Sequence, residues 1–107
     1  MTQLVQNILY NVSSILVNDI GAEQVYLFGS YANGTENSES DIDLFIVTDL
    51  TEKKKIDVTQ QARRALLKKT TLPIDIIVCD KMIFESRRTN QTTFEYVIAT
   101  EGKKIYG

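Results

Sequence analysis

The sequence contains no histidine, and it has only one cysteine and one proline among its 107 residues. The absence of histidine excludes Ser–His–Asp triads, histidine general bases and His-rich zinc sites. The single cysteine, Cys79, cannot form a disulfide within the chain, and it is consistent with a reducing cytoplasm. Any acid–base or metal chemistry must therefore depend on carboxylates.

Long hydrophobic runs are missing as well. No stretch approaches the roughly 18 consecutive apolar residues that a membrane-spanning helix needs, so we expect no membrane partner. The N-terminus shows no basic segment followed by an apolar one, so we expect no secretory signal. The length suits one domain with one modest core. We therefore expect a single cytoplasmic domain spanning residues 1–107.

Basic residues are absent from the first half of the chain. Residues 1–50 contain seven acidic residues and no Lys or Arg, whereas residues 51–107 contain all twelve basic residues and seven acidic ones. An acidic half suits cations, and a basic half suits phosphates or an acidic partner surface. Solvated helix faces explain most of the basic residues equally well.

Apolar periodicity and turn residues predict four helices and three strands. The helices are expected over 3–17, from Thr51 to about 69, over 82–88 and over 92–100; the strands over 24–28, 41–48 and 73–80. The segment 29–40 is rich in turn residues, with room for a helical turn over 30–33, and 103–106 is expected to be an extended tail. This alternation predicts an α/β (α+β) domain with helices packed on a small sheet.

Two of the predicted helices have candidate core faces. In the helix that begins near Thr51, the spacing places the following side chains inward: Ile56, Ala62, Ala65 and Leu66. In the last helix it places Phe94, Val97 and Ile98 on one side.

Three aspartates interrupt strands that otherwise look buried. Asp41 and Asp43 are two residues apart on a strand, so their side chains share one face and repel each other unless a cation lies between them. Asp75 could join them if its strand lies alongside. An all-oxygen ligand set favours Mg²⁺ or Mn²⁺, and a carboxylate platform for two such ions suits phosphoryl transfer.

A Gly-Ser turn lies just upstream of these aspartates. Gly29 follows a strand directly and allows the backbone to approach a ligand closely, and Ser30 offers a hydroxyl, as in phosphate-binding turns. Each feature alone has an ordinary explanation, a strand-edge aspartate or a hairpin turn with a serine cap. The segment lacks the pattern of a Walker A loop, of a dinucleotide-binding fold and of a calcium-binding hand.

The combination of these motifs resembles a known superfamily. Gly29-Ser30, ten residues and then Asp41-x-Asp43, with Asp75 on a later strand, resembles the nucleotidyltransferases that include DNA polymerase beta. It is most similar to the small single-domain members, the minimal nucleotidyltransferase (MNT) group. The resemblance covers nearly the whole chain and implies a single minimal nucleotidyltransferase domain over residues 1–107, with a mixed sheet flanked by helices.

The resemblance also implies roles for the five motif residues. Asp41 and Asp43 would bind both Mg²⁺ ions, and Asp75 would complete the second site and assist deprotonation of the acceptor hydroxyl. Gly29 and Ser30 would hold the β- and γ-phosphates of a nucleoside triphosphate. The resemblance implies that the chain is an antitoxin whose partner is a HEPN-domain ribonuclease toxin, because members of this size are typically such antitoxins. Several of them transfer AMP from ATP to a tyrosine hydroxyl of that toxin. Such an enzyme would form a hetero-oligomer with its toxin, and we expect no direct nucleic-acid partner.

The sequence departs from the small relatives in one respect. Many of them have arginines in the turn where this chain has Tyr31 and Asn33. Other basic residues would then have to contact the nucleotide, with Arg63, Arg64, Arg87 and Arg88 as candidates. The alternative is a non-catalytic antitoxin that neutralises its toxin by masking it. Because we expect a single domain with no second one to hold such an acceptor, we do not expect transfer to a small molecule or to RNA.

Overall fold

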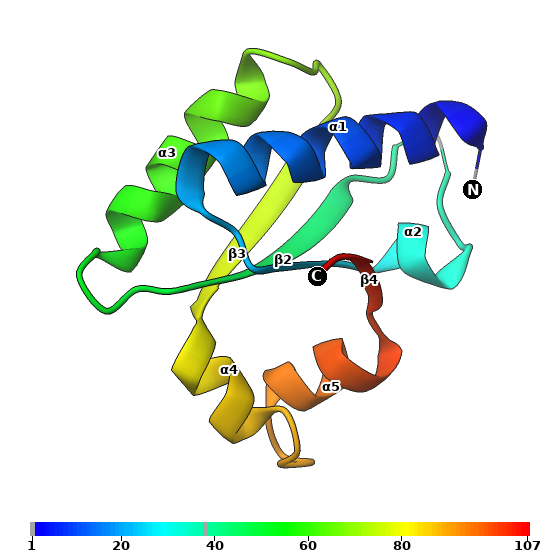
Figure 1. Ribbon diagram of the computed structural model, residues 1–107. Helices are drawn as coiled ribbons and strands as arrows, with labels where there is room; N and C mark the ends of the chain where they lie inside the picture. The colour runs from blue at the N-terminus through cyan, green and yellow to red at the C-terminus, as the bar shows by residue number, and fades with distance from the viewer. Residues whose placement is uncertain (1, 38) are drawn as a thin grey trace.

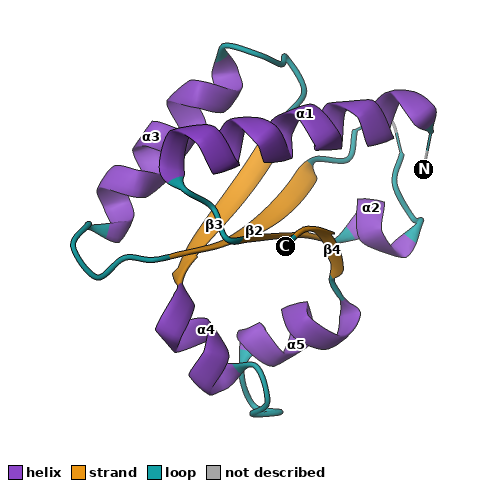
Figure 2. Ribbon diagram, viewed as in Figure 1, coloured by secondary structure: helices purple, strands orange, loops and turns teal. Residues whose placement is uncertain are grey.

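The computed structural model describes residues 2–37 and 39–107, in which a four-stranded sheet lies between two helical layers. Helices α1 and α3 cover one face of the sheet, and α4 and α5 cover the other (Figure 1). Figure 2 shows α2 at the end of the molecule where the chain enters β2. The elements in chain order are α1 (Gln3–Ile20), β1 (Gln24–Phe28), α2 (Ser30–Asn33), β2 (Ile42–Thr48), α3 (Lys55–Leu67), β3 (Ile74–Asp80), α4 (Lys81–Arg87), α5 (Phe94–Glu101) and β4 (Lys103–Tyr106).

The sheet has the strand order β3-β2-β1-β4. β1 is antiparallel to both β2 and β4, whereas β2 and β3 are parallel and are joined through α3. This mixed sheet with flanking helices confirms the predicted fold class. The segment expected to be an extended tail forms the fourth strand, β4, which pairs with β1.

The alternation of side chains along β2 divides the core into two parts. Leu44 and Ile46 face α1 and α3 and belong to the larger cluster. Phe45 and Val47 face the other way and pack with the fully buried Phe84 of α4. Burial on both faces explains why β2 is an almost continuous apolar run.

Helix α1 extends three residues beyond the predicted end at 17. The side-chain oxygen of Thr2 accepts a hydrogen bond from the N–H of Val5 at the start, and Gly21 ends the helix with a left-handed φ of 66°. Because Gly21 supplies the terminating conformation, Asn18 and Asp19 stay helical. No helix in the two described ranges is both long and apolar enough to cross a membrane.

Helix α3 begins at Lys55, so the predicted start at Thr51 is wrong. The Asp49 side chain accepts hydrogen bonds from both the N–H and the hydroxyl of Thr51, which holds this residue in a turn. The predicted inward direction of Ile56 is also wrong, because its side chain is 59% exposed. The buried face instead follows Val58, with Ala62 and Leu66 at four-residue spacing, and Ala65 is half-buried.

Helix α5 buries less of its apolar surface than the sequence predicted. Ile98 is buried, but Phe94 and Val97 are largely exposed. The rings of Phe28 and Phe45 contact Phe94 from one side only, with centroid distances of 5.6 and 6.0 Å. An apolar surface on α5 is therefore left open to solvent.

Candidate active site

Asp43 and Asp75 are direct neighbours on adjacent strands. The parallel pairing of β2 and β3 sets Asp43 opposite Asp75 in register, so the two side chains leave the sheet on the same face. Asp41 lies two residues before Asp43, just outside β2, and is exposed. The face that carries Asp43 is the one covered further along by α4 and α5.

The electrostatics of the Asp43 carboxyl reflect this crowding. Partial burial raises the pKa of Asp43 above its ordinary value, and the negative charges of Asp75 and Asp41 raise it further. No basic side chain contributes to the shift. The ion pairs found in residues 2–37 and 39–107 involve other acidic residues, Glu23 and Glu85. Negative charge is thus concentrated here without a protein cation to balance it.

The carboxylates do not form a complete metal cage as they stand. Within the described part of the chain, no three Asp, Glu, His or Cys side chains converge closely enough to hold a metal ion. Mutual repulsion keeps carboxylates apart when no cation separates them. The fixed part of the arrangement is the Asp43–Asp75 pair, and its oxygen donors are of the kind that Mg²⁺ and Mn²⁺ prefer. The residues present therefore fit a hard divalent cation in type and charge.

The Gly-Ser turn packs directly against the Asp43 carboxylate. Gly29 has φ 75° and ψ −154°, a conformation that is essentially restricted to glycine. A Cβ atom at this position would collide with the Asp43 carboxylate oxygen Oδ2. Ser30 follows immediately as the first residue of α2. The structure therefore brings the two halves of the sequence motif, the turn and the strand aspartate, into contact.

Aromatic residues border the carboxylates, which the sequence analysis did not recognise. Phe28 lies opposite Asp43 in the antiparallel pairing of β1 and β2. Phe94 reaches over from α5 and packs edge-on against Phe28. Phe28 directly precedes Gly29 in the sequence, and this position could have predicted that it lies near the carboxylates. Phe94 gave no such signal, because its place depends on how α5 packs.

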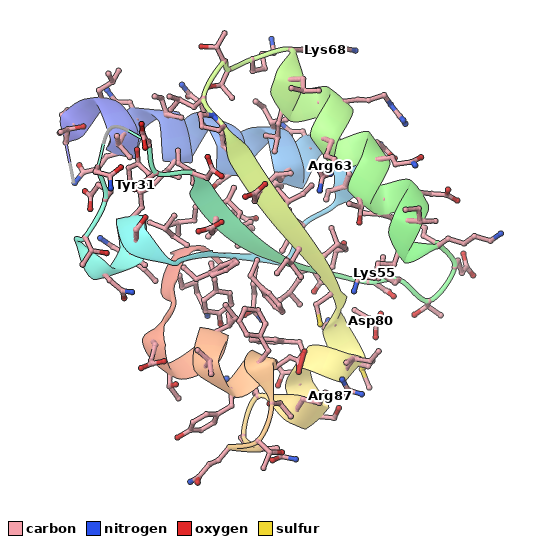
Figure 3. All side chains as sticks on the ribbon, turned by 180° about the vertical axis from the view of Figure 1, so that it is seen from behind. Tyr31, Lys55, Arg63, Lys68, Asp80 and Arg87 are labelled. Carbon is pink, nitrogen blue, oxygen red and sulfur yellow. The ribbon has the colours of Figure 1, made fainter. Side chains whose placement is uncertain are left out.

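The four arginines suggested as substitutes for the turn arginines lie elsewhere. Arg63 borders a groove beside α3, and Arg64 lines a separate hollow with Lys68. Arg87 lines a cavity with Lys55 and Asp80, at the end of β3 opposite to Asp75. Arg88 forms an ion pair with Glu85. Figure 3 shows Arg63 and Arg87 well away from Tyr31 in the turn.

Comparison with known proteins identifies the family. The family model described as "Nucleotidyltransferase domain" matches residues 9–101, which is most of the chain. The chain therefore belongs to the nucleotidyltransferase domain family, and its class is that of a transferase. No curated protein matches it.

Two solved structures are similar to this fold. A candidate nucleotidyltransferase from Sulfolobus solfataricus is 28% identical, with a TM-score of 0.53; the match covers 78% of this chain and 70% of that protein. A toxin–antitoxin structure containing AMP-PNP is 24% identical, with a TM-score of 0.58, and the match covers 92% of this chain and 73% of that one. The second similarity supports the fold alone.

Proposed function

We propose that the chain is a metal-dependent nucleotidyltransferase that transfers AMP from ATP to a hydroxyl group of a partner HEPN-domain toxin. We expect the acceptor to be a tyrosine hydroxyl. The chain would act as the antitoxin of this toxin. The observation that carries the proposal is the contact between the Gly29 turn and Asp43, with Asp75 in register beside it. This contact supports the proposal because it joins the two halves of the sequence motif. The toxin–antitoxin neighbour with AMP-PNP is consistent with the partner and the nucleotide.

Each motif residue has a role in this proposal. Asp41, Asp43 and Asp75 would hold the Mg²⁺ or Mn²⁺ ions, which supply charge neutralisation at the transferring phosphate. Gly29 lets the turn lie directly against the Asp43 carboxylate, and the turn would hold the β- and γ-phosphates, with Ser30 offering its hydroxyl to them. The acceptor oxygen attacks the α-phosphorus, the bond to the β-phosphate oxygen breaks, and pyrophosphate leaves. Asp75 takes the proton of the acceptor hydroxyl.

The acceptor side of the site follows from this geometry. The Gly29 turn lies at the β1 side of Asp43, whereas Asp75 lies at its β3 side. In-line displacement requires the attacking and leaving oxygens on opposite sides of the phosphorus. The partner hydroxyl is therefore expected to approach Asp75 over the sheet face that carries the aspartates, from the side away from the Gly29 turn, where Asp75 is exposed.

The alternative function is a non-catalytic antitoxin that masks its toxin. Two observations favour it. The turn contains Tyr31 and Asn33. The groups that shift the pKa of Asp43 do not include a basic side chain. Weak nucleotide affinity would follow from both features. The intact set of three aspartates favours the enzyme, because masking requires none of them.

The two functions can be separated by incubating the chain with α-labelled ATP, Mg²⁺ and the product of the adjacent gene. The enzyme is expected to attach the label to that product, and the Asp43→Asn variant is expected to attach none. Asp49→Asn is a matched control, since Asp49 is an exposed aspartate after the other end of β2. Inhibition of the toxin without label transfer, equal for the native chain and Asp43→Asn, would establish masking instead.

A further inference from the structure

The two edge strands of the sheet differ in how well they are protected against pairing with a strand of another chain. β4 is four residues long and carries two exposed lysines, Lys103 and Lys104. Short length and lysines are the usual means by which an edge strand avoids pairing with another chain. β3 is seven residues long and contains neither a basic residue nor a proline. The edge formed by β3 is therefore competent to pair, whereas the edge formed by β4 is protected.

The backbone of β3 has a definite outward side. The N–H of Ile42 donates to the carbonyl of Pro73 at 3.0 Å, which directs the polar groups of Pro73 and of every second residue after it toward β2. The backbone groups of the alternate residues, Ile74, Ile76, Val78 and Asp80, therefore point away from the sheet. They form a row of donors and acceptors along the free edge.

Helix α3 runs beside this edge and carries a stripe of four exposed residues with an aliphatic side chain at each end. Ile56, Gln60, Arg63 and Leu67 are spaced so that they share one face of α3. Ile56 and Leu67, at the two ends of the stripe, are 59% and 78% exposed. Covering these two side chains in an assembly would remove their apolar surface from water.

The stripe and the strand edge belong to one surface. Arg63 and Leu67 line a groove together with Ile74 and Ile76, which places the end of α3 beside the start of β3. Lys55 lies near Asp80, so the beginning of α3 is beside the end of β3. The helix therefore runs antiparallel to the strand, and the Arg63–Leu67 end of the stripe lies beside the start of β3.

We propose that this surface binds a second copy of the same chain, with the two β3 strands paired antiparallel about a two-fold axis at Ile77. In this register Ile74 lies opposite Asp80 of the second copy and Ile76 lies opposite Val78. All four positions are those whose backbone groups point outward, so every outward group of β3 gains a partner. A register displaced by two residues leaves part of this row unpaired.

The same axis matches the side chains on both faces. It brings the Leu67 end of one α3 to the Ile56 end of the other, and Arg63 to Gln60, so that no two arginines oppose each other. Across the strands, Asp75 lies opposite Cys79 rather than opposite another acidic residue. Because strand and helix are self-complementary about one axis, a second copy fits this surface without like charges being opposed.

A covalent cross-link at position 77 tests the axis directly. Residues that face each other across the axis without exchanging hydrogen bonds have Cα atoms about 4.5 Å apart, within the range for a disulfide. In a Cys79→Ala background, Ile77→Cys is expected to give a disulfide-linked dimer under mild oxidation. Leu4→Cys, on the exposed part of α1, is the matched control and is expected to give no disulfide-linked dimer.

Charge substitutions at the same position give an independent test by analytical ultracentrifugation. The native chain is expected to sediment as a dimer, and Ile77→Lys and Ile77→Asp each as monomers, because like charges then oppose each other. Mixing the two variants is expected to restore the dimer, and Leu4→Lys should leave it intact. A monomeric native chain, or a dimer that survives Ile77→Lys and shows no cross-link at position 77, would overturn the proposal. Label transfer does not enter either measurement, so failure here leaves the proposed function standing.

Discussion

The Asp43 carboxylate occupies the space that a side chain at position 29 would need. Gly29 therefore does two things: it adopts a positive φ, and it leaves the carboxylate in contact with the backbone of the turn. This contact couples the turn that precedes α2 to the strand that carries Asp43. The first prediction follows from it.

Replacing Gly29 by alanine is expected to abolish label transfer and to destabilise the chain. The backbone strain at this φ and ψ costs about 1–3 kcal/mol, and displacement of Asp43 adds to it. Gly34→Ala is the control, since Gly34 has a similar φ of 74° but no atom within 4 Å of the added Cβ. Transfer assays and thermal unfolding should separate them: Gly34→Ala keeps transfer and loses only some stability. Equal transfer by both variants would contradict the role of the contact.

Replacing Asp43 by asparagine is expected to abolish transfer while making the metal-free chain more stable. Because the pKa of Asp43 is raised in the folded chain, folding favours the protonated form, and stability falls as the pH rises through the titration of this carboxyl. At neutral pH the whole penalty is present, and asparagine removes it. Denaturant unfolding in the presence of EDTA measures the change.

Asp49 provides the opposite case for the same measurement. Hydrogen bonds from the Thr51 hydroxyl and N–H lower the pKa of Asp49, so its charged form favours folding. Asp49→Asn is therefore expected to lower stability at neutral pH, whereas Asp43→Asn raises it. A fall in stability for Asp43→Asn would show that the carboxylate is balanced by a partner in the free chain.

Replacing Phe84 by alanine is expected to destabilise the chain by about 3–5 kcal/mol, the usual cost of removing a buried phenylalanine. Phe84 is fully buried and contacts the rings of Tyr26 and Phe45, each at a centroid distance of 5.6 Å. It is thus the main attachment of α4 to the sheet. Met82→Ala, at an exposed position on the same helix, should change stability by less than about 0.5 kcal/mol.

The thiol of Cys79 is expected to be unreactive at neutral pH. Burial raises its pKa to about 11, so the thiolate fraction near pH 7.5 is about a hundredfold lower than in the unfolded chain. The rate of alkylation should rise with pH until the pH approaches 11, and denaturation at pH 7.5 should restore ordinary reactivity. A fast reaction in the folded chain at pH 7.5 would mean that the thiol is exposed or activated.

The sequence predicted the strands and most helices because their signals are local. β-Branched and aromatic residues followed by Gly29 define β1 and its end, and the aspartates mark the start of β2. The predicted start of α3 failed because a short-range interaction, the turn held by Asp49 and Thr51, competes with helix formation there. Ile56 was predicted to be buried because it is apolar, but the helix phase is set by Val58 and the residues that follow it at four-residue spacing.

The pairing of the strands could not be predicted from the sequence. The pairing of Asp43 with Asp75 depends on β3 lying parallel to β2 and in one register, which is decided by how α3 packs. From the sequence alone, Asp75 would join Asp43 only if the two strands were adjacent. The aromatic border depends likewise on α5, since Phe94 reaches Phe28 from a distant part of the chain.

The central claim is that Asp41, Asp43 and Asp75 together hold divalent ions beside the Gly29 turn. The most direct measurement is a titration with Mn²⁺, followed by electron paramagnetic resonance, in the presence of a non-hydrolysable ATP analogue. We predict that the native chain and Asp49→Asn bind Mn²⁺, and that Asp43→Asn and Asp75→Asn each bind it at least tenfold more weakly. Undiminished Mn²⁺ binding by Asp43→Asn and Asp75→Asn would contradict the claim.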